Sequence, residues 1–215
     1  MSTGSEVLSG TYLHKVIQLF PEYRPEDFWS LIFCGDNLDA PYDGWSGVVA
    51  APVFSSAQPY ERFFGEFKDS LAQYENVPSW RINYDVSRVQ AFSEFRSFIT
   101  SNTEHPVFIS ANAASWALPI LTEAVNLDVA GYWNAQLICL RELYSMTHAE
   151  QPLLRSEYLG ELFTTAPKVP KRFGLHAISD ALRVQVPNSG TKAMYRALLT
   201  AKCAESCLNA QYPLQ

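Results

Sequence analysis

The hydrophobic pattern of this chain changes its period part-way along, and that change constrains the fold more than any other feature. Residues 28–33 and 47–54 are short apolar runs, rich in aromatic or β-branched residues and bounded by turn residues, as is typical of buried strands. From residue 87 to residue 100 the apolar side chains instead recur at helical spacing, as at Phe92 and Phe95. Strands followed by a helical C-terminal half predict an α/β domain with a central mixed β-sheet flanked by α-helices.

Further elements follow from the same patterns. We expect strands at residues 62–67 and 106–110, and helices at residues 7–20, 115–125, 137–146, 157–163, 173–182 and 192–209. The last helix carries a stripe of small residues that includes Ala197 and Ala201, and such a stripe lets a helix approach its neighbour closely. Because 215 residues suit one domain, we assign residues 1–27 to an N-terminal helical extension and residues 28–210 to the domain itself.

The charge of the chain argues against extended contact with nucleic acid. The net charge is −6 and the pI is about 5.2, so the protein repels a phosphate backbone on average. The densest basic cluster, formed by Lys168, Lys171 and Arg172, is small and typical of a solvated loop. We therefore expect a protein partner, with single-stranded nucleic acid as the alternative.

Localisation and redox state follow from apolar content and cysteine usage. No stretch is long and apolar enough to cross a membrane, and the polar N-terminus lacks the apolar core of a signal peptide. Nothing in the scattered cysteines demands disulfides, so we expect a cytoplasmic protein without membrane contact. Cys203 and Cys207 lie one helical turn apart, which suits either two metal ligands or two small residues on a buried helix face. The buried face is the favoured interpretation.

Several stretches occur in an order and spacing that point to a known family. Residues 106–121 have the sequence PVFISANAASWALPIL and lie between the helices expected at residues 92–99 and 137–143. A segment at residues 173–182 then leads to TKAMYRALLTA at residues 191–201. This arrangement resembles the DEDD-type (DnaQ-like) three-prime-to-five-prime exonucleases, which have a ribonuclease-H-like fold. The resemblance rests on order, spacing and apolar pattern.

The residues at the family's signature positions depart from its pattern. The resemblance implies two-metal hydrolysis, in which carboxylates hold two divalent cations. The family's D-x-E pair falls on Cys34 and Asp36, its second-motif Asp on Ala117, its final His on Thr191 and its final Asp on Arg196. Mg²⁺ needs hard oxygen ligands, which alanine and arginine do not supply, and a threonine hydroxyl is too weak a base near neutrality. We therefore expect no catalytic residue, no metal and no cofactor.

Residues around the lost site are candidates for binding. The resemblance places Asp36, Asn112, Trp116 and Arg196 around the old cleft, with Trp116 just before the lost second carboxylate. We predict that the Arg196 guanidinium pairs with Asp36 and replaces the cation, because a lone buried carboxylate is costly. The alternative is that Arg196 extends along the helix surface into solvent.

Two classes of function remain open. The chain is expected to be a catalytically inactive exonuclease-like module that binds a protein, or single-stranded nucleic acid weakly. The alternative is an active exonuclease that uses Mg²⁺ or Mn²⁺ and takes relocated ligands from Asp36, Asp39, Asp43 or Glu61. The first three of these carboxylates crowd one loop rich in Asp, Asn, Gly and Pro, a composition that turns also require for backbone reasons.

Overall fold

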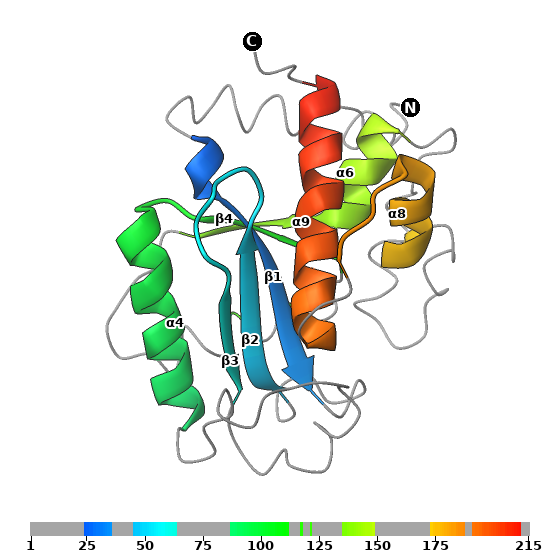
Figure 1. Ribbon diagram of the computed structural model, residues 1–215. Helices are drawn as coiled ribbons and strands as arrows, with labels where there is room; N and C mark the ends of the chain where they lie inside the picture. The colour runs from blue at the N-terminus through cyan, green and yellow to red at the C-terminus, as the bar shows by residue number, and fades with distance from the viewer. Residues whose placement is uncertain are drawn as a thin grey trace, which may run out of the picture.

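The structure, a computed structural model of the chain, describes residues 24–35, 45–63, 87–111, 117, 121, 135–148, 173–187 and 191–211. The elements in these residues are η1 (Pro25–Asp27), β1 (Phe28–Gly35), β2 (Trp45–Pro52), β3 (Tyr60–Phe63), α4 (Arg88–Asn102), β4 (Val107–Ser110), β5 (Gln136–Cys139), α6 (Leu140–Thr147), α8 (Leu175–Leu182) and α9 (Lys192–Gln211). Figure 1 shows α4 on one side of the sheet and α6, α8 and α9 on the other.

The strands form one mixed sheet of five strands in the order β3-β2-β1-β4-β5. β1 pairs antiparallel with β2 and parallel with β4, β2 pairs antiparallel with β3, and β4 pairs parallel with β5. Because β1, β4 and β5 run parallel, their C-terminal ends lie at the same end of the sheet. The predicted fold class, a central mixed sheet flanked by helices, is confirmed.

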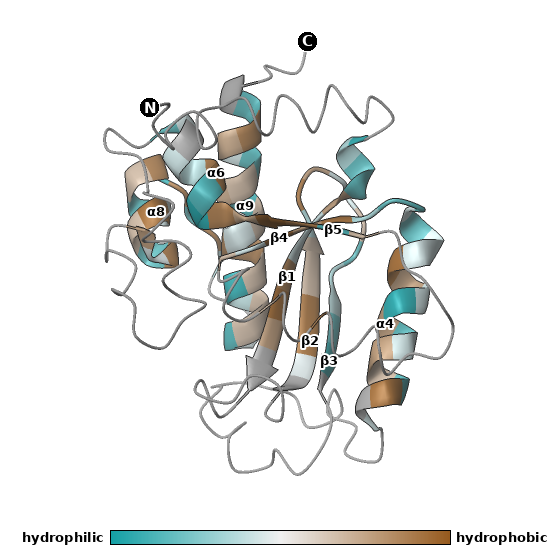
Figure 2. Ribbon diagram, turned by 180° about the vertical axis from the view of Figure 1, so that it is seen from behind, coloured by the Kyte–Doolittle hydropathy of each residue, from teal (hydrophilic) through white to brown (hydrophobic). Residues whose placement is uncertain are grey.

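The sheet face under α4 is sealed by large aromatic side chains. The rings of Trp29 and Phe98 meet edge to face with centroids 5.9 Å apart, and Phe95 lies 5.8 Å from Phe108. Trp29, Phe95 and Phe108 are fully buried. Figure 2 shows the interior strands β1 and β4 as hydrophobic and the edge strand β3 as hydrophilic. Aromatic burial of this kind contributes strongly to core stability.

The opposite sheet face is covered by α9 through small side chains. Ala197 is 0% exposed and Ala201 is 2% exposed, and α9 contacts β1, β2 and β4. This confirms the prediction that the last helix packs on the sheet through its alanine stripe, because small residues allow close approach. Although α9 has 20 residues, no described helix is apolar and long enough to cross a bilayer.

Most of the predicted elements are confirmed. The strands expected at residues 28–33, 47–54 and 106–110 correspond to β1, β2 and β4. The strand expected at residues 62–67 begins earlier, at Tyr60, and is described as far as Phe63. The helices expected at residues 87–100, 173–182 and 192–209 are found as α4, α8 and α9.

The helix expected at residues 137–146 is wrong in its first part. Gln136–Cys139 forms the edge strand β5, and α6 begins only at Leu140. The physical reason is the free edge of β4, which offers backbone partners to Leu137 and Ile138 through parallel pairing. The expected helices at residues 7–20 and 157–163, and most of the one at residues 115–125, lie outside the described residues.

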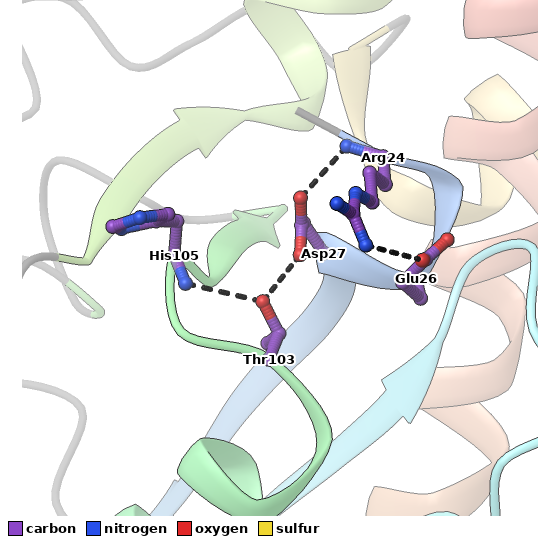
Figure 3. Close-up of polar contacts among 5 residues, drawn as sticks. All are labelled: Arg24, Glu26, Asp27, Thr103 and His105. Carbon is purple, nitrogen blue, oxygen red and sulfur yellow. Dashed lines mark hydrogen bonds and ion pairs between the residues drawn. The ribbon is translucent and has the colours of Figure 1, made fainter. Parts of the chain in front are cut away.

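A buried polar contact joins the start of β1 to the end of α4 (Figure 3). The Asp27 carboxylate accepts hydrogen bonds from the Arg24 backbone N–H at 2.7 Å and from the Thr103 hydroxyl. Thr103 Oγ1 in turn accepts the His105 backbone N–H at 3.1 Å. Asp27 and Thr103 are both buried, so this contact satisfies polar groups that burial would otherwise penalise. It lies at the N-terminal ends of the parallel strands β1 and β4.

We predict that Thr103→Val lowers the free energy of unfolding by about 1–3 kcal/mol, because it leaves the buried Asp27 carboxylate without its hydroxyl partner. The matched control is Thr200→Val. Thr200 is also fully buried, but its hydroxyl has no hydrogen-bond partner among the described residues. The control should therefore leave stability unchanged or raised. Urea unfolding followed by circular dichroism measures the free energy of unfolding of both variants. An equal loss of stability in the two would contradict the role given to the Thr103 hydroxyl.

Candidate functional site

The C-terminal end of β1 lies beside the first turns of α9 (Figures 1 and 2). The C-terminal part of β1, which contains Cys34, thus lies near Thr191, which directly precedes α9, and near the turn of α9 that contains Arg196. Several predicted site residues lie outside the described residues, namely Asp36, Asp39, Asp43, Asn112 and Trp116. The structure therefore describes Ala117, Thr191, Arg196 and the backbone of Cys34.

Thr191 caps the N-terminus of α9. It is fully buried and directly precedes the helix, and its Oγ1 accepts the backbone N–H of Met194 at 3.0 Å. Its hydroxyl also donates to the Glu61 carboxylate on β3. An N-cap hydroxyl satisfies one of the free N–H groups at a helix start. Thr191, at the position matched to the family's general base, thus has both hydrogen-bonding roles of its hydroxyl occupied.

Glu61 reaches Thr191 because of its place in the sheet. Glu61 pairs with Val49, and Val49 pairs with Ile32 on β1, so the three side chains share the sheet face that α9 covers. A carboxylate at a helix N-terminus is stabilised by the helix dipole as well as by the hydroxyl hydrogen bond. Glu61, a candidate relocated metal ligand in the sequence, therefore has a structural contact in the folded chain.

Arg196 lies on the second turn of α9 and is exposed. Lys192 precedes it by one helical turn and is also exposed, so the two cations are neighbours on the helix surface. Exposure of Arg196 agrees with the alternative in which its side chain extends into solvent. The ion pair with Asp36 stays a prediction, since Asp36 lies outside the described residues.

Ala117 occupies an apolar environment. It is fully buried and belongs to the aromatic cluster under α4, together with Phe92 and Phe95. A methyl group offers no ligand atom, and the buried side chains of this cluster among the described residues are apolar. The position matched to the family's second carboxylate is therefore filled by hydrocarbon.

The cysteines of α9 are buried thiols rather than reactive groups. Burial, with a further contribution from Cys207, raises the pKa of Cys203 to about 12. Burial raises the pKa of Cys207 to about 11, against a hydrogen bond with Thr147 that lowers it. Protonated thiols are poor nucleophiles and poor metal ligands, which supports the packing interpretation of this pair. Among the described residues no group of three or more His, Cys, Asp or Glu side chains could hold a metal ion.

An aromatic pair at the contact between α8 and α9 was not predicted from the sequence. His176 on α8 and Tyr195 on α9 stack with ring centroids 6.3 Å apart and an interplanar angle of 26°. Neither residue belongs to a motif, and they come together only because α8 packs against α9. The i, i+4 spacing of Lys192 and Arg196 was the one signal in the sequence that could have drawn attention to this surface.

Comparisons of the sequence with known proteins give no match, either to a protein-family model or to a curated protein. The fold does match solved structures. In the ExoI/SSB-Ct complex the matched chain is 11% identical with a TM-score of 0.54, over 86% of this chain and 41% of that one. E. coli exonuclease I with a 5cy-dA13 oligonucleotide is 11% identical with a TM-score of 0.51, over the same shares of 86% and 41%.

A third structure, exonuclease I from Methylocaldum szegediense, is 10% identical with a TM-score of 0.54, over 86% of this chain and 41% of that one. This chain thus spans about two fifths of the length of the exonuclease I chains it matches, 41% in each case. Such low identity shows the fold alone. The chain has a DEDD exonuclease-like, ribonuclease-H-like fold, which confirms the resemblance found in the sequence.

We predict that Thr191→Val lowers the free energy of unfolding by about 1–3 kcal/mol, because it removes the helix cap and the hydroxyl donor to Glu61. Thr191→Ser keeps both hydrogen bonds and should retain most of the stability. Chemical unfolding of the two variants measures the difference. If serine is as destabilising as valine, the hydroxyl contacts do not hold the start of α9.

Proposed function

We propose that this exonuclease-like domain is catalytically inactive and acts by binding another protein. The observation that carries the proposal is the buried Thr191, whose hydroxyl donates to Glu61 and accepts from the Met194 backbone. A general base must be free to take a proton from water or substrate at a pKa near the working pH. A buried, doubly hydrogen-bonded alcohol meets neither requirement.

Of the other matched positions, Ala117 and Arg196 do not fit Mg²⁺ or Mn²⁺, and Asp36 alone would supply a carboxylate. Two-metal hydrolysis needs several carboxylate oxygens around two closely spaced cations. Ala117 contributes a buried methyl group, and Arg196 brings a positive charge to the position of a ligand carboxylate. Positive charge there repels a divalent cation. No metal-dependent step is therefore assigned to this chain.

A protein partner suits the charge of the chain better than a nucleic acid does. The net charge of −6 opposes the approach of a phosphate backbone over a large surface. Structures of exonuclease I, which contains a domain of matching fold, include one with SSB-Ct and one with an oligonucleotide. We place the protein in the cytoplasm, where the free thiols of Cys139, Cys203 and Cys207 would remain reduced.

We predict that the purified protein shows no degradation of single-stranded DNA or RNA above background in Mg²⁺ or Mn²⁺. The reason is the missing ligand set at Ala117 and Arg196. A gel assay with labelled oligonucleotides measures this, and titration of either metal should leave the melting temperature unchanged, since only a ligand bound by the native state raises it.

The variants Asp36→Ala and Glu61→Gln serve as controls for the alternative with relocated ligands. Degradation that depends on metal and disappears in Asp36→Ala would overturn the proposal. Loss of this degradation in Glu61→Gln alone would instead identify Glu61 as a relocated metal ligand, provided that the variant has the melting temperature of the wild type.

A further inference from the structure

The first two turns of α9 carry two cations that have no acidic partner among the described residues. Lys192 and Arg196 are both exposed and lie one turn apart. Other basic side chains of the described chain do pair with acids, as Lys202 does with Glu205 at 2.6 Å and Arg62 with Glu94 at 2.9 Å. Lys192 and Arg196 thus form a local positive charge in a chain with 22 acidic and 16 basic residues.

An aromatic surface lies next to these cations. Tyr195 directly precedes Arg196 and follows Lys192 by three positions, so its side chain emerges from the same two turns. Its ring is half-buried and stacks on the exposed ring of His176, with centroids 6.3 Å apart. We call the surface made by His176, Lys192, Tyr195 and Arg196 the α9 cationic face.

We infer that the α9 cationic face binds a short acidic segment of a protein partner. Carboxylates of the segment meet Lys192 and Arg196, and an apolar or aromatic side chain of the segment rests on the stacked rings of His176 and Tyr195. Arginine forms strong charge-assisted hydrogen bonds with carboxylates, and both cations attract the segment during encounter. This inference rests on the proposed function, because it assigns the partner's contact to a surface beside the lost catalytic site.

The local charge distribution favours an acidic segment over nucleic acid. Only two cations mark the face, and the exposed Asp180 lies one turn beyond His176 on α8. A nucleic-acid strand carries a charge at every nucleotide, and two cations can neutralise only a small part of it. A short segment needs to meet only the cations and the rings.

The experiment measures fluorescence anisotropy of a labelled peptide that contains four Glu and one Trp. Its controls are the same peptide with Gln in place of Glu, and a short oligothymidylate of equal charge. We expect the protein to bind the Glu peptide and to bind the Gln peptide at least about tenfold more weakly, as two charge contacts imply. The double variant Lys192→Glu/Arg196→Glu should lose affinity for the Glu peptide by a similar factor.

A matched double variant distinguishes an effect of the α9 cationic face from an effect of the net charge of the protein. Lys202→Glu/Arg24→Glu changes the charge by the same amount, at exposed positions on the far part of α9 and beside η1. It should bind the Glu peptide as the wild type does. Equal loss in both double variants, or no preference for the Glu peptide over the Gln peptide, would overturn the inference. Tighter binding of oligothymidylate through Lys192 and Arg196 would also overturn it and identify the face as a nucleic-acid site.

Two further measurements test the Asp36–Arg196 ion pair and the lack of catalysis separately from the acidic-segment inference. If Asp36 forms an ion pair with Arg196 as predicted, Asp36→Asn should strengthen peptide binding, because the Arg196 guanidinium is then free to contact the peptide. Metal-dependent degradation with peptide binding intact would overturn only the proposed lack of catalysis. Absent peptide binding in a protein that also degrades nothing would overturn only the acidic-segment inference.

Discussion

The close contact between α9 and the sheet determines where most other features of the molecule lie. Alanines at positions 193, 197, 201 and 204 are buried on the sheet-facing side of the helix, so the helix axis can approach β1 and β2 closely. That approach brings the start of α9 within hydrogen-bonding reach of Glu61 on β3. It also leaves the opposite flank of the first turns open, where Lys192 and Arg196 are exposed.

Two contacts between a buried threonine hydroxyl and a carboxylate tie helix ends to the sheet. Thr103 donates to Asp27 where β1 and β4 begin, and Thr191 donates to Glu61 level with the second half of β1. Each joins segments far apart in the chain, with separations of 76 and 130 residues. Such contacts stabilise a fold because they satisfy a threonine hydroxyl that is buried away from water.

The sequence predicted the fold well because its information is local and periodic. Apolar runs marked β1, β2 and β4, and helical spacing marked α4, α8 and α9. β5 was missed because Gln136–Cys139 has only four residues and runs directly into α6, so periodicity could not separate strand from helix. The contact between Glu61 and Thr191 was invisible for a different reason: it depends on strand register, which no short sequence pattern encodes.

Under the proposed function, Thr191 and Arg196 stand at a helix end that keeps its place in the fold while its chemistry differs from that of the exonucleases. A cluster of metal-binding carboxylates repels itself unless cations are bound, so each such carboxylate limits stability when the metal is absent. A chain that binds no metal can use the same positions for the fold or for the surface. Thr191 points inward and caps the helix, whereas Arg196 is exposed in the next turn. Stability and recognition are thereby assigned to different residues of one helix end, and substitutions at the two positions should act on different measurable properties.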